Sequence, residues 1–254
     1  MKARLSRPAT ADGLFVWVLH RFAEVFEEHA IVRGGVALRL LDCPRSTTDV
    51  DYVFVPFRSK NEILASIRGV LSEIEGASIE VRVHSKTIRA SVRLDAVAIA
   101  IEASVGMECP SMAVATAGLA IAEGQPSRLV RVMGIDRALT HKLAAWNERR
   151  LLRDLFDVYY LVARLGAKPE LDVLRKRLSK FESRLPVLRK RKSMTLSVFA
   201  AELQREVDAV EEGRIADELA PVLPADELAG LVPRLRAAVL RVVELVAAGG
   251  FRSA

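Results

Sequence analysis

The sequence contains few residues of the kinds that build disulfide frameworks or zinc sites. Its two cysteines, Cys43 and Cys109, are each followed by proline, and their separation matches no metal-ligand motif. The four histidines are scattered along the chain, so zinc chemistry is not expected. We interpret the cysteines as ordinary thiols in a reducing compartment, which favours a cytoplasmic protein.

Long hydrophobic runs are also missing. No apolar stretch approaches the roughly 18 residues that a membrane-spanning helix needs, so no membrane partner is expected. The first residues, MKARLSRPATADG, include no apolar segment, so we expect no secretory signal. Hydrophobic residues nevertheless make up 51% of the 254, which excludes a disordered protein and suffices for a sizeable core.

The strongest chemical signal is an acidic pair, Asp49 and Asp51, that begins a β-branched and aromatic run. That run predicts a strand, in which residues two apart point to the same face. Adjacent carboxylates repel each other unless a cation lies between them, and oxygen ligands suit Mg²⁺. The alternative is a solvated pair on an edge strand. Gly34 and Gly35 favour the metal site, because a glycine pair lets the backbone approach a phosphate closely.

Gly-Gly followed by D-x-D resembles the signature of the DNA polymerase β-like nucleotidyltransferases, although most of that superfamily has Gly-Ser. The stretch is most similar to the first motif of the AbiEii/AbiGii-type toxins, including the MenT-like enzymes: G-G-x-A-L, then R-x-[S/T]-x-D-x-D. The matching residues are Gly34, Gly35, Ala37, Leu38, Arg45, Thr47, Asp49 and Asp51. The resemblance implies nucleotide binding by Gly34, Gly35, Arg45 and Thr47.

A second block, residues 136–160, is similar to a later motif of the same toxins, K-L-x-A…R-x-x-x-R-D-[L]-x-D-x-[Y]. The resemblance implies that Lys142 grips nucleotide phosphates and that Asp154 completes the active site. On one straight helix these side chains would point about 120° apart, so we expect a break at residues 147–149. The alternative is an amphipathic helix with ion pairs between residues four apart: Arg150–Asp154 and Arg153–Asp157.

A two-metal site needs a third carboxylate, and there are two candidates. Glu102 lies inside an apolar run, where a carboxylate is unfavourable unless a metal, or an arginine such as Arg89 or Arg93, accompanies it. Asp95 lies between two strand-like runs, where a hairpin turn needs a polar residue. The resemblance favours Glu102, although many relatives have lysine where this chain has Ala100.

Positive charge is concentrated in residues 175–192, which contain a single acid, Glu182. Such a cluster is typical of contacts with a phosphate backbone, and the alternative is a solvated helix face. Because Phe181 is the one aromatic residue there, shape-based binding to duplex RNA is favoured over base stacking. The predicted RNA-binding residues are Arg189, Lys190, Arg191 and Lys192.

Alternating strands and helices, followed by helices alone, predict an α+β protein with a mixed-sheet core over residues 1–134 and a helical domain over 135–254. We expect Asp12 to be the N-cap of a helix over 14–29, and residues 107–128 to be irregular. The resemblance implies a polymerase β-like core.

The resemblance also implies a Mg²⁺-dependent nucleotidyltransferase toxin that moves a nucleoside monophosphate from an NTP to an acceptor, namely the 3′ end of tRNA, and so blocks translation. Asp49, Asp51 and Glu102 would bind two Mg²⁺ ions, and an antitoxin protein is the expected partner. The alternatives are an antibiotic- or protein-modifying nucleotidyltransferase, or a catalytically impaired binding module of the same fold.

Overall fold

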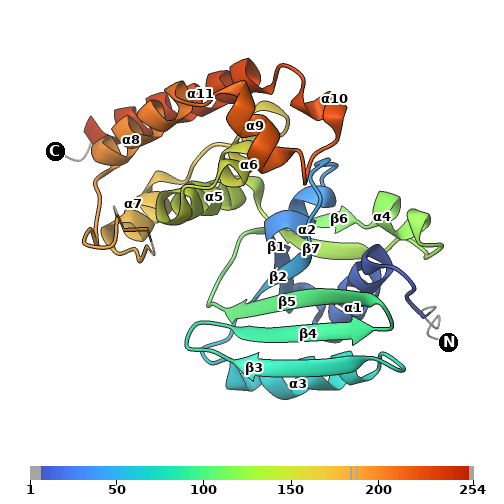
Figure 1. Ribbon diagram of the computed structural model, residues 1–254. Helices are drawn as coiled ribbons and strands as arrows, with labels where there is room; N and C mark the ends of the chain where they lie inside the picture. Colours follow the sequence, from blue (N-terminus) through green and yellow to red (C-terminus); the bar gives the residue numbers. More distant parts are fainter. Residues whose placement is uncertain (1–6, 184, 187, 252–254) are drawn as a thin grey trace. The chain divides into compact units, whose positions relative to one another are not determined.

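The computed structural model describes residues 7–183, 185, 186 and 188–251. The chain divides into two compact units, Met1–Gly134 and Ile135–Ala254 (Figure 1). The first unit contains a mixed sheet with helices, and the second is helical throughout its regular elements. The architecture confirms the α+β class that the sequence predicts.

The first unit is built on a seven-stranded sheet in the order β3-β4-β5-β2-β1-β7-β6. β2 runs parallel to β5 and antiparallel to β1, and β1 runs parallel to β7. The strands are β1 (Ala30–Arg33), β2 (Asp49–Phe54), β3 (Ser78–Val83), β4 (Ile88–Leu94), β5 (Val97–Val105), β6 (Ser111–Ala115) and β7 (Leu129–Met133).

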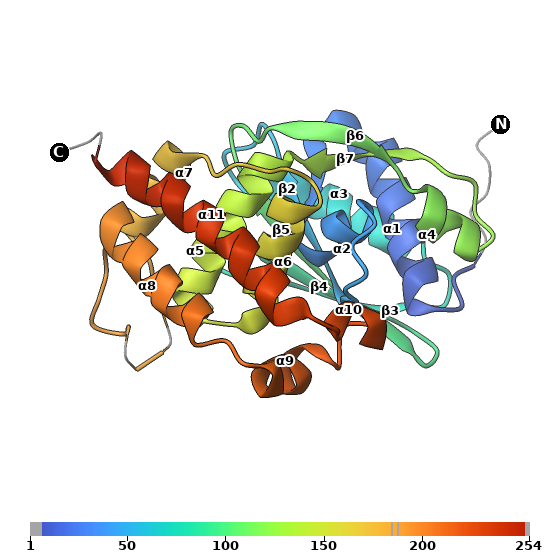
Figure 2. The same cartoon turned by 90° about the horizontal axis from the view of Figure 1, so that it is seen from above.

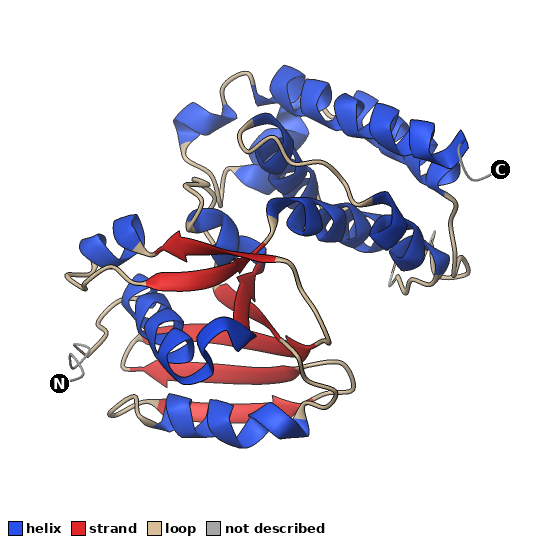
Figure 3. Cartoon of the chain, turned by 180° about the vertical axis from the view of Figure 1, so that it is seen from behind, coloured by secondary structure: helices blue, strands red, loops and turns tan. Residues whose placement is uncertain are grey.

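Two helices, α1 (Ala11–Phe26) and α3 (Asn61–Ser72), cover one face of this sheet (Figure 3). Every second residue of β2 is buried beneath them: Val50, Tyr52 and Phe54. The alternate residues, Asp49 and Asp51, therefore lie on the opposite face. The short helical elements of this unit are η1 (Glu27–His29), α2 (Gly34–Arg39) and α4 (Ala117–Ala122).

The prediction that Asp12 caps α1 is wrong. The N-cap is Thr10, whose Oγ1 accepts a hydrogen bond of 2.8 Å from the backbone nitrogen of Gly13. Asp12 lies inside the first turn and accepts two hydrogen bonds, of 2.7 and 2.8 Å, from Arg39. Hydrogen bonding to that guanidinium lowers the pKa of the Asp12 carboxyl below its ordinary value. Asp12 thus joins α1 to α2.

The prediction of an irregular segment over residues 107–128 is also wrong, because β6 and α4 lie within it. β6 is the last strand of the sheet and pairs with β7. Met112 and Ala113 at its centre are exposed, so the strand lacks the alternation of buried and exposed residues that marks an internal strand.

In the second unit, α11 packs along α8 and against α6 (Figure 2). Trp146, Phe156 and Phe199 are fully buried in its core. No described helix is both long and apolar enough to cross a membrane. The helices are α5 (Ile135–Arg149), α6 (Leu152–Ala163), α7 (Leu171–Ser179), α8 (Leu196–Asp208), α9 (Glu212–Leu219), α10 (Ala225–Leu228) and α11 (Leu231–Phe251).

Candidate active-site residues

Four charged residues form a row across the face of the sheet that α1 and α3 leave uncovered. Asp51 on β2 lies opposite Glu102 on the parallel strand β5. On the outer sides, Arg33 of β1 lies opposite Asp51, and Arg89 of β4 lies opposite Glu102. Directly paired residues share a sheet face, so two central carboxylates are flanked by two guanidinium groups. Asp49, two residues before Asp51, belongs to the same face.

Each oxygen of Glu102 is near one of these arginines. Arg89 donates a hydrogen bond from Nε to Oε2 of Glu102 at 2.8 Å, and Nη2 of Arg33 lies 3.9 Å from Oε1. Arg89, one of the two partners that the sequence suggested, therefore contacts Glu102. The other, Arg93, lies opposite Ala98, four residues further along β4.

Asp95, the second candidate for the third carboxylate, occupies the turn between β4 and β5. Its φ is +53°, and its side chain is 74% exposed and lies 3.1 Å from Nη2 of Arg7. The turn is at the end of β5 remote from Glu102, so Asp95 does not belong to the row that contains Asp51. The geometry supports Glu102 as the third carboxylate.

The donor atoms on this face have the chemistry that Mg²⁺ requires, because Asp49, Asp51 and Glu102 offer carboxylate oxygens. They are not gathered round a common point: among the residues that the structure describes, no three acidic, histidine or cysteine side chains are close enough to hold a metal. Glu102 is occupied by arginines, and Asp49 accepts a hydrogen bond from Thr47. The ligand types fit, but the cluster is not preformed.

The glycine pair forms the first turn of α2, where it allows two close approaches. Gly34 has φ +73°, and a Cβ on it would lie 2.2 Å from Oδ2 of Asp51. A Cβ on Gly35 would lie 2.6 Å from Oγ1 of Thr47 and 3.0 Å from Nη2 of Arg45. The missing side chains thus let β2 and the preceding loop pack directly against the start of α2.

The predicted nucleotide-binding side chains Arg45 and Thr47 differ in accessibility. Arg45 is buried, and its Nη1 donates a hydrogen bond of 3.0 Å to the carbonyl oxygen of Ser46. Thr47 is half-buried, and its hydroxyl donates a hydrogen bond of 2.8 Å to Oδ1 of Asp49. Arg45 therefore shapes the loop, whereas Thr47 directly contacts the acidic pair.

In the helical unit, the chain breaks between the two positions of the second motif. α5 ends at Arg149, Arg150 has φ +56°, and α6 begins at Leu152. The break predicted at residues 147–149 therefore occurs just after them. α6 folds back against α5, so two residues twelve positions apart become neighbours: Nζ of Lys142 is 3.9 Å from Oδ1 of Asp154.

Lys142 makes a closer contact with Asp157, whose Oδ2 is 2.6 Å from Nζ. Asp154 also accepts hydrogen bonds of 2.6 and 3.1 Å from Arg149. Both carboxylates are almost completely buried, and burial raises the pKa of the Asp154 carboxyl above its ordinary value although the two cations oppose the shift. Removing Lys142 would leave the two buried carboxylates with less neighbouring positive charge, which would destabilise the folded protein. Lys142 therefore also supports the fold.

Asp157 was not among the predicted site residues. Its sequence signal was a second acid three residues after Asp154 in an otherwise apolar helical stretch. The Arg150–Asp154 ion pair of the alternative interpretation does not form, because Asp154 pairs with Arg149 and Lys142. The positive φ at Arg150 turns this residue away, and its guanidinium lies 4.2 Å from the centre of the Trp146 ring.

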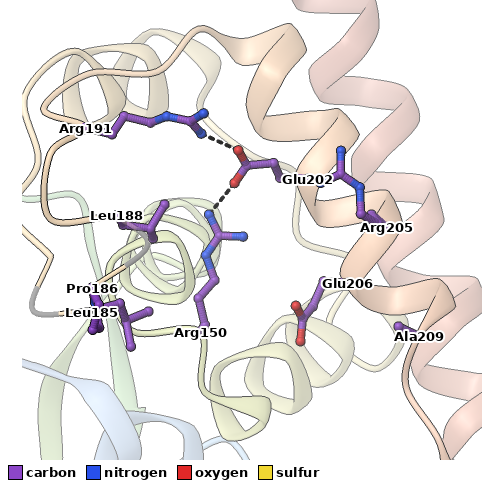
Figure 4. A pocket seen from close by; sticks show the side chains of 9 residues that line it. All are labelled: Arg150, Leu185, Pro186, Leu188, Arg191, Glu202, Arg205, Glu206 and Ala209. Carbon is purple, nitrogen blue, oxygen red and sulfur yellow. Dashed lines mark hydrogen bonds and ion pairs between the residues drawn. The ribbon is translucent and has the colours of Figure 1, made fainter.

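The predicted RNA-binding residues belong to the loop between α7 and α8. Arg189, Lys190 and Lys192 are exposed and form no ion pair with any described residue; they make up the basic trio. Arg191 instead contacts Glu202, which Arg150 reaches from another side (Figure 4). These three charged residues line a pocket of about 720 Å³. Arg184, also in the basic segment, lies outside the described residues.

The fold is shared with solved structures of other bacterial proteins. It is similar to that of MenT4, a nucleotidyltransferase toxin from Mycobacterium tuberculosis H37Rv, with a TM-score of 0.64, 16% identity, and coverage of 95% of this chain and 85% of that one. It is also similar to JHP933 from Helicobacter pylori, with a TM-score of 0.51, 14% identity and coverage of 95% and 92%.

The model of the family "Nucleotidyl transferase AbiEii toxin, Type IV TA system" matches residues 17–241. Because this match spans most of the chain, the protein belongs to the AbiEii family. The family and the enzyme class predicted from the two motifs are confirmed: the protein is a nucleotidyltransferase of a toxin–antitoxin system, which implies an antitoxin partner. No curated protein matches the sequence.

Proposed function

We propose that this nucleotidyltransferase is a Mg²⁺-dependent toxin that transfers a nucleoside monophosphate from an NTP to the 3′ end of tRNA and thereby blocks translation in the cytoplasm. The observation that carries the proposal is the register that sets Asp51 beside Glu102, with Asp49 on the same face. When bound, two Mg²⁺ ions would polarise the α-phosphate and activate the acceptor hydroxyl.

The residues of the chain have separate tasks in this proposal. Asp49 and Asp51 would hold both metal ions, and Glu102 would hold the ion that activates the acceptor hydroxyl. Gly34 and Gly35 let the backbone approach the β- and γ-phosphates, because neither carries a side chain that would keep a phosphate away.

Two residues of the second motif have further roles in this proposal. Lys142 neutralises the negative charge that develops on the leaving pyrophosphate, and Asp154 keeps its ammonium group oriented. Their contact across the α5–α6 break, together with the pairing of Lys142 to buried Asp157, supports a fixed position for this ammonium group.

The basic trio supports a polynucleotide acceptor. Exposed cations without a carboxylate partner among the described residues are available to phosphates, and a small antibiotic would not need an extended basic loop. Since the aromatic side chain of Phe181 is buried, the loop suits phosphate contacts along a duplex stem better than stacking on bases.

The test is incubation of the protein with Mg²⁺, each labelled NTP in turn and total tRNA. We expect the label at the 3′ end of the tRNA. The Asp49→Ala and Asp51→Ala variants should transfer no label, although their circular dichroism spectra should match that of the wild type. Label on protein or on an aminoglycoside would favour the modifying enzymes. An absence of label on any acceptor, with NTP still bound, would indicate a binding module, and an active Asp51→Ala variant would refute the metal site.

A further inference from the structure

Two arginines hold the carboxylate group of Glu102. The hydrogen bond from Arg89 engages one carboxylate oxygen at 2.8 Å, and Arg33 approaches the other at 3.9 Å. Arg33 is anchored less well, because its Nε is buried and has no hydrogen-bond partner among the described residues. Arg89 therefore makes the principal contact.

This contact competes with the role that Glu102 has in the proposed function. A guanidinium group bound to a carboxylate occupies its lone pairs and repels an approaching divalent cation. The three acids of this face share one sheet surface, yet they are not gathered into a metal-binding group within the described part of the chain. Arg89 engages Glu102 from β4, which lies on the side of β5 opposite β2.

We propose that Arg89 is a positioning residue that holds Glu102 away from Asp49 and Asp51 until a divalent cation displaces it. The inference rests on the proposed metal role of Glu102. In this mechanism the arginine raises the cation concentration at which the three carboxylates converge. Replacing Arg89 leaves the three carboxylates in place but removes the group that competes with the cation. The replacement should therefore strengthen metal binding.

The chain offers a matched control on the same strand. Arg93, like Arg89, is exposed and projects from the same face of β4, because the two residues are four positions apart. Arg93 lies opposite Ala98 and forms no ion pair with a described residue. Arg89→Gln and Arg93→Gln therefore remove the same charge, and only the first removes a contact with Glu102.

The measurement is a titration of the metal-free full-length protein with Mn²⁺, followed by electron paramagnetic resonance of the free ion. We expect Arg89→Gln to tighten Mn²⁺ binding about two- to fivefold, as suits an exposed ion pair, and Arg93→Gln to change it by less. An equal shift in both variants, or no shift in Arg89→Gln, would overturn the proposal. Arg89→Met serves as a second variant of similar length, and thermal unfolding verifies that each is folded.

A double-mutant cycle separates this inference from the function on which it rests. Glu102→Gln alone should weaken Mn²⁺ binding, and adding Arg89→Gln to it should have no further effect. If Glu102→Gln leaves Mn²⁺ affinity unchanged, the third-ligand assignment itself is wrong. If Glu102→Gln weakens binding while Arg89→Gln leaves it unchanged, only the positioning role of Arg89 fails.

Discussion

Gly34 and Asp51 are so close that a Cβ on the glycine would lie 2.2 Å from Oδ2 of the aspartate. Asp51 is one of the two central carboxylates of the row on the sheet, and Gly34 begins the short helix α2. The glycine therefore serves two purposes. It accepts a positive φ that other residues adopt reluctantly, and it leaves room for the carboxylate. The first motif is held together by this contact between its two ends.

Gly34→Ala is accordingly expected to abolish nucleotidyl transfer. The added methyl group would displace the Asp51 carboxylate, and the strained φ would destabilise the protein by about 1–2 kcal/mol. Activity assays and urea denaturation measure the two effects. Gly118→Ala is the control, since a Cβ there meets no atom within 4 Å. Full activity in Gly34→Ala would mean that Asp51 tolerates displacement.

Glu102→Gln should be inactive, and Asp95→Asn should behave nearly as the wild type. The neutral amide of the first variant is a poor ligand for Mg²⁺, whereas Asp95 lies in an exposed turn with Arg7 as its partner. Turnover of labelled NTP compares them directly. The reverse pattern would assign the third carboxylate to Asp95.

Two substitutions of Thr47 test whether its hydroxyl group is sufficient for activity and whether a negative charge at this position abolishes it. Thr47→Ser keeps the donor to Asp49 and should be close to wild type, whereas Thr47→Glu adds a negative charge beside two carboxylates and should be inactive. The affinity for an NTP, measured by equilibrium binding, should fall along with activity in the second variant. Unchanged affinity in Thr47→Glu would mean that the loop lies away from the triphosphate.

Replacing the basic trio with serine should weaken tRNA binding and flatten its dependence on salt. Each lost phosphate contact lowers the slope of log K against log salt by roughly 0.7–0.9. Arg191 is left intact because its pairing with Glu202 stabilises the loop. The charge-matched control replaces exposed basic residues elsewhere in the unit: Arg164, Lys168 and Arg241. An identical salt slope in both triple variants would mean that the trio is a solvated surface.

His20 should make the stability of the protein depend on pH. It is buried on α1 with Nε2 2.9 Å from Oγ1 of Thr116, and burial, aided by Arg128, lowers its pKa to about 4. Between pH 6.5 and 4 the unfolded chain binds a proton that the folded protein does not. The free energy of unfolding should therefore decrease as the pH is lowered from 6.5 to 4, by up to roughly 3 kcal/mol.

Urea denaturation at pH 7.5 and 5 measures this effect. His20→Gln is the control, because glutamine can still form a hydrogen bond with Thr116 but does not titrate. The fall in unfolding free energy should be smaller in the variant. Equal falls in the two proteins would assign the pH dependence to other groups.

Much of the local structure could be predicted from the sequence, because its causes lie within a few residues. Alternation along β2 placed Asp49 and Asp51 on one face, and the angular separation of Lys142 from Asp154 required a break in the helix. Edge strand β6 could not be predicted in this way, since its exposed centre removes the alternation. The N-cap of α1 was predicted wrongly because the Asp12 side chain binds Arg39 of α2, a tertiary contact that local capping rules do not include.

The sequence by itself determined the family and the α+β class, since these depend on motifs and periodicities that are local. Only the tertiary structure decided which acid accompanies Asp51, because the parallel pairing of β2 with β5 brings Glu102 beside it from a distant part of the chain. The tertiary structure likewise decided the ion pair between Arg89 and Glu102 and the ion pair between Lys142 and Asp157. Such contacts depend on strand order and on the direction in which a helix resumes after a break, and no short stretch of sequence encodes either.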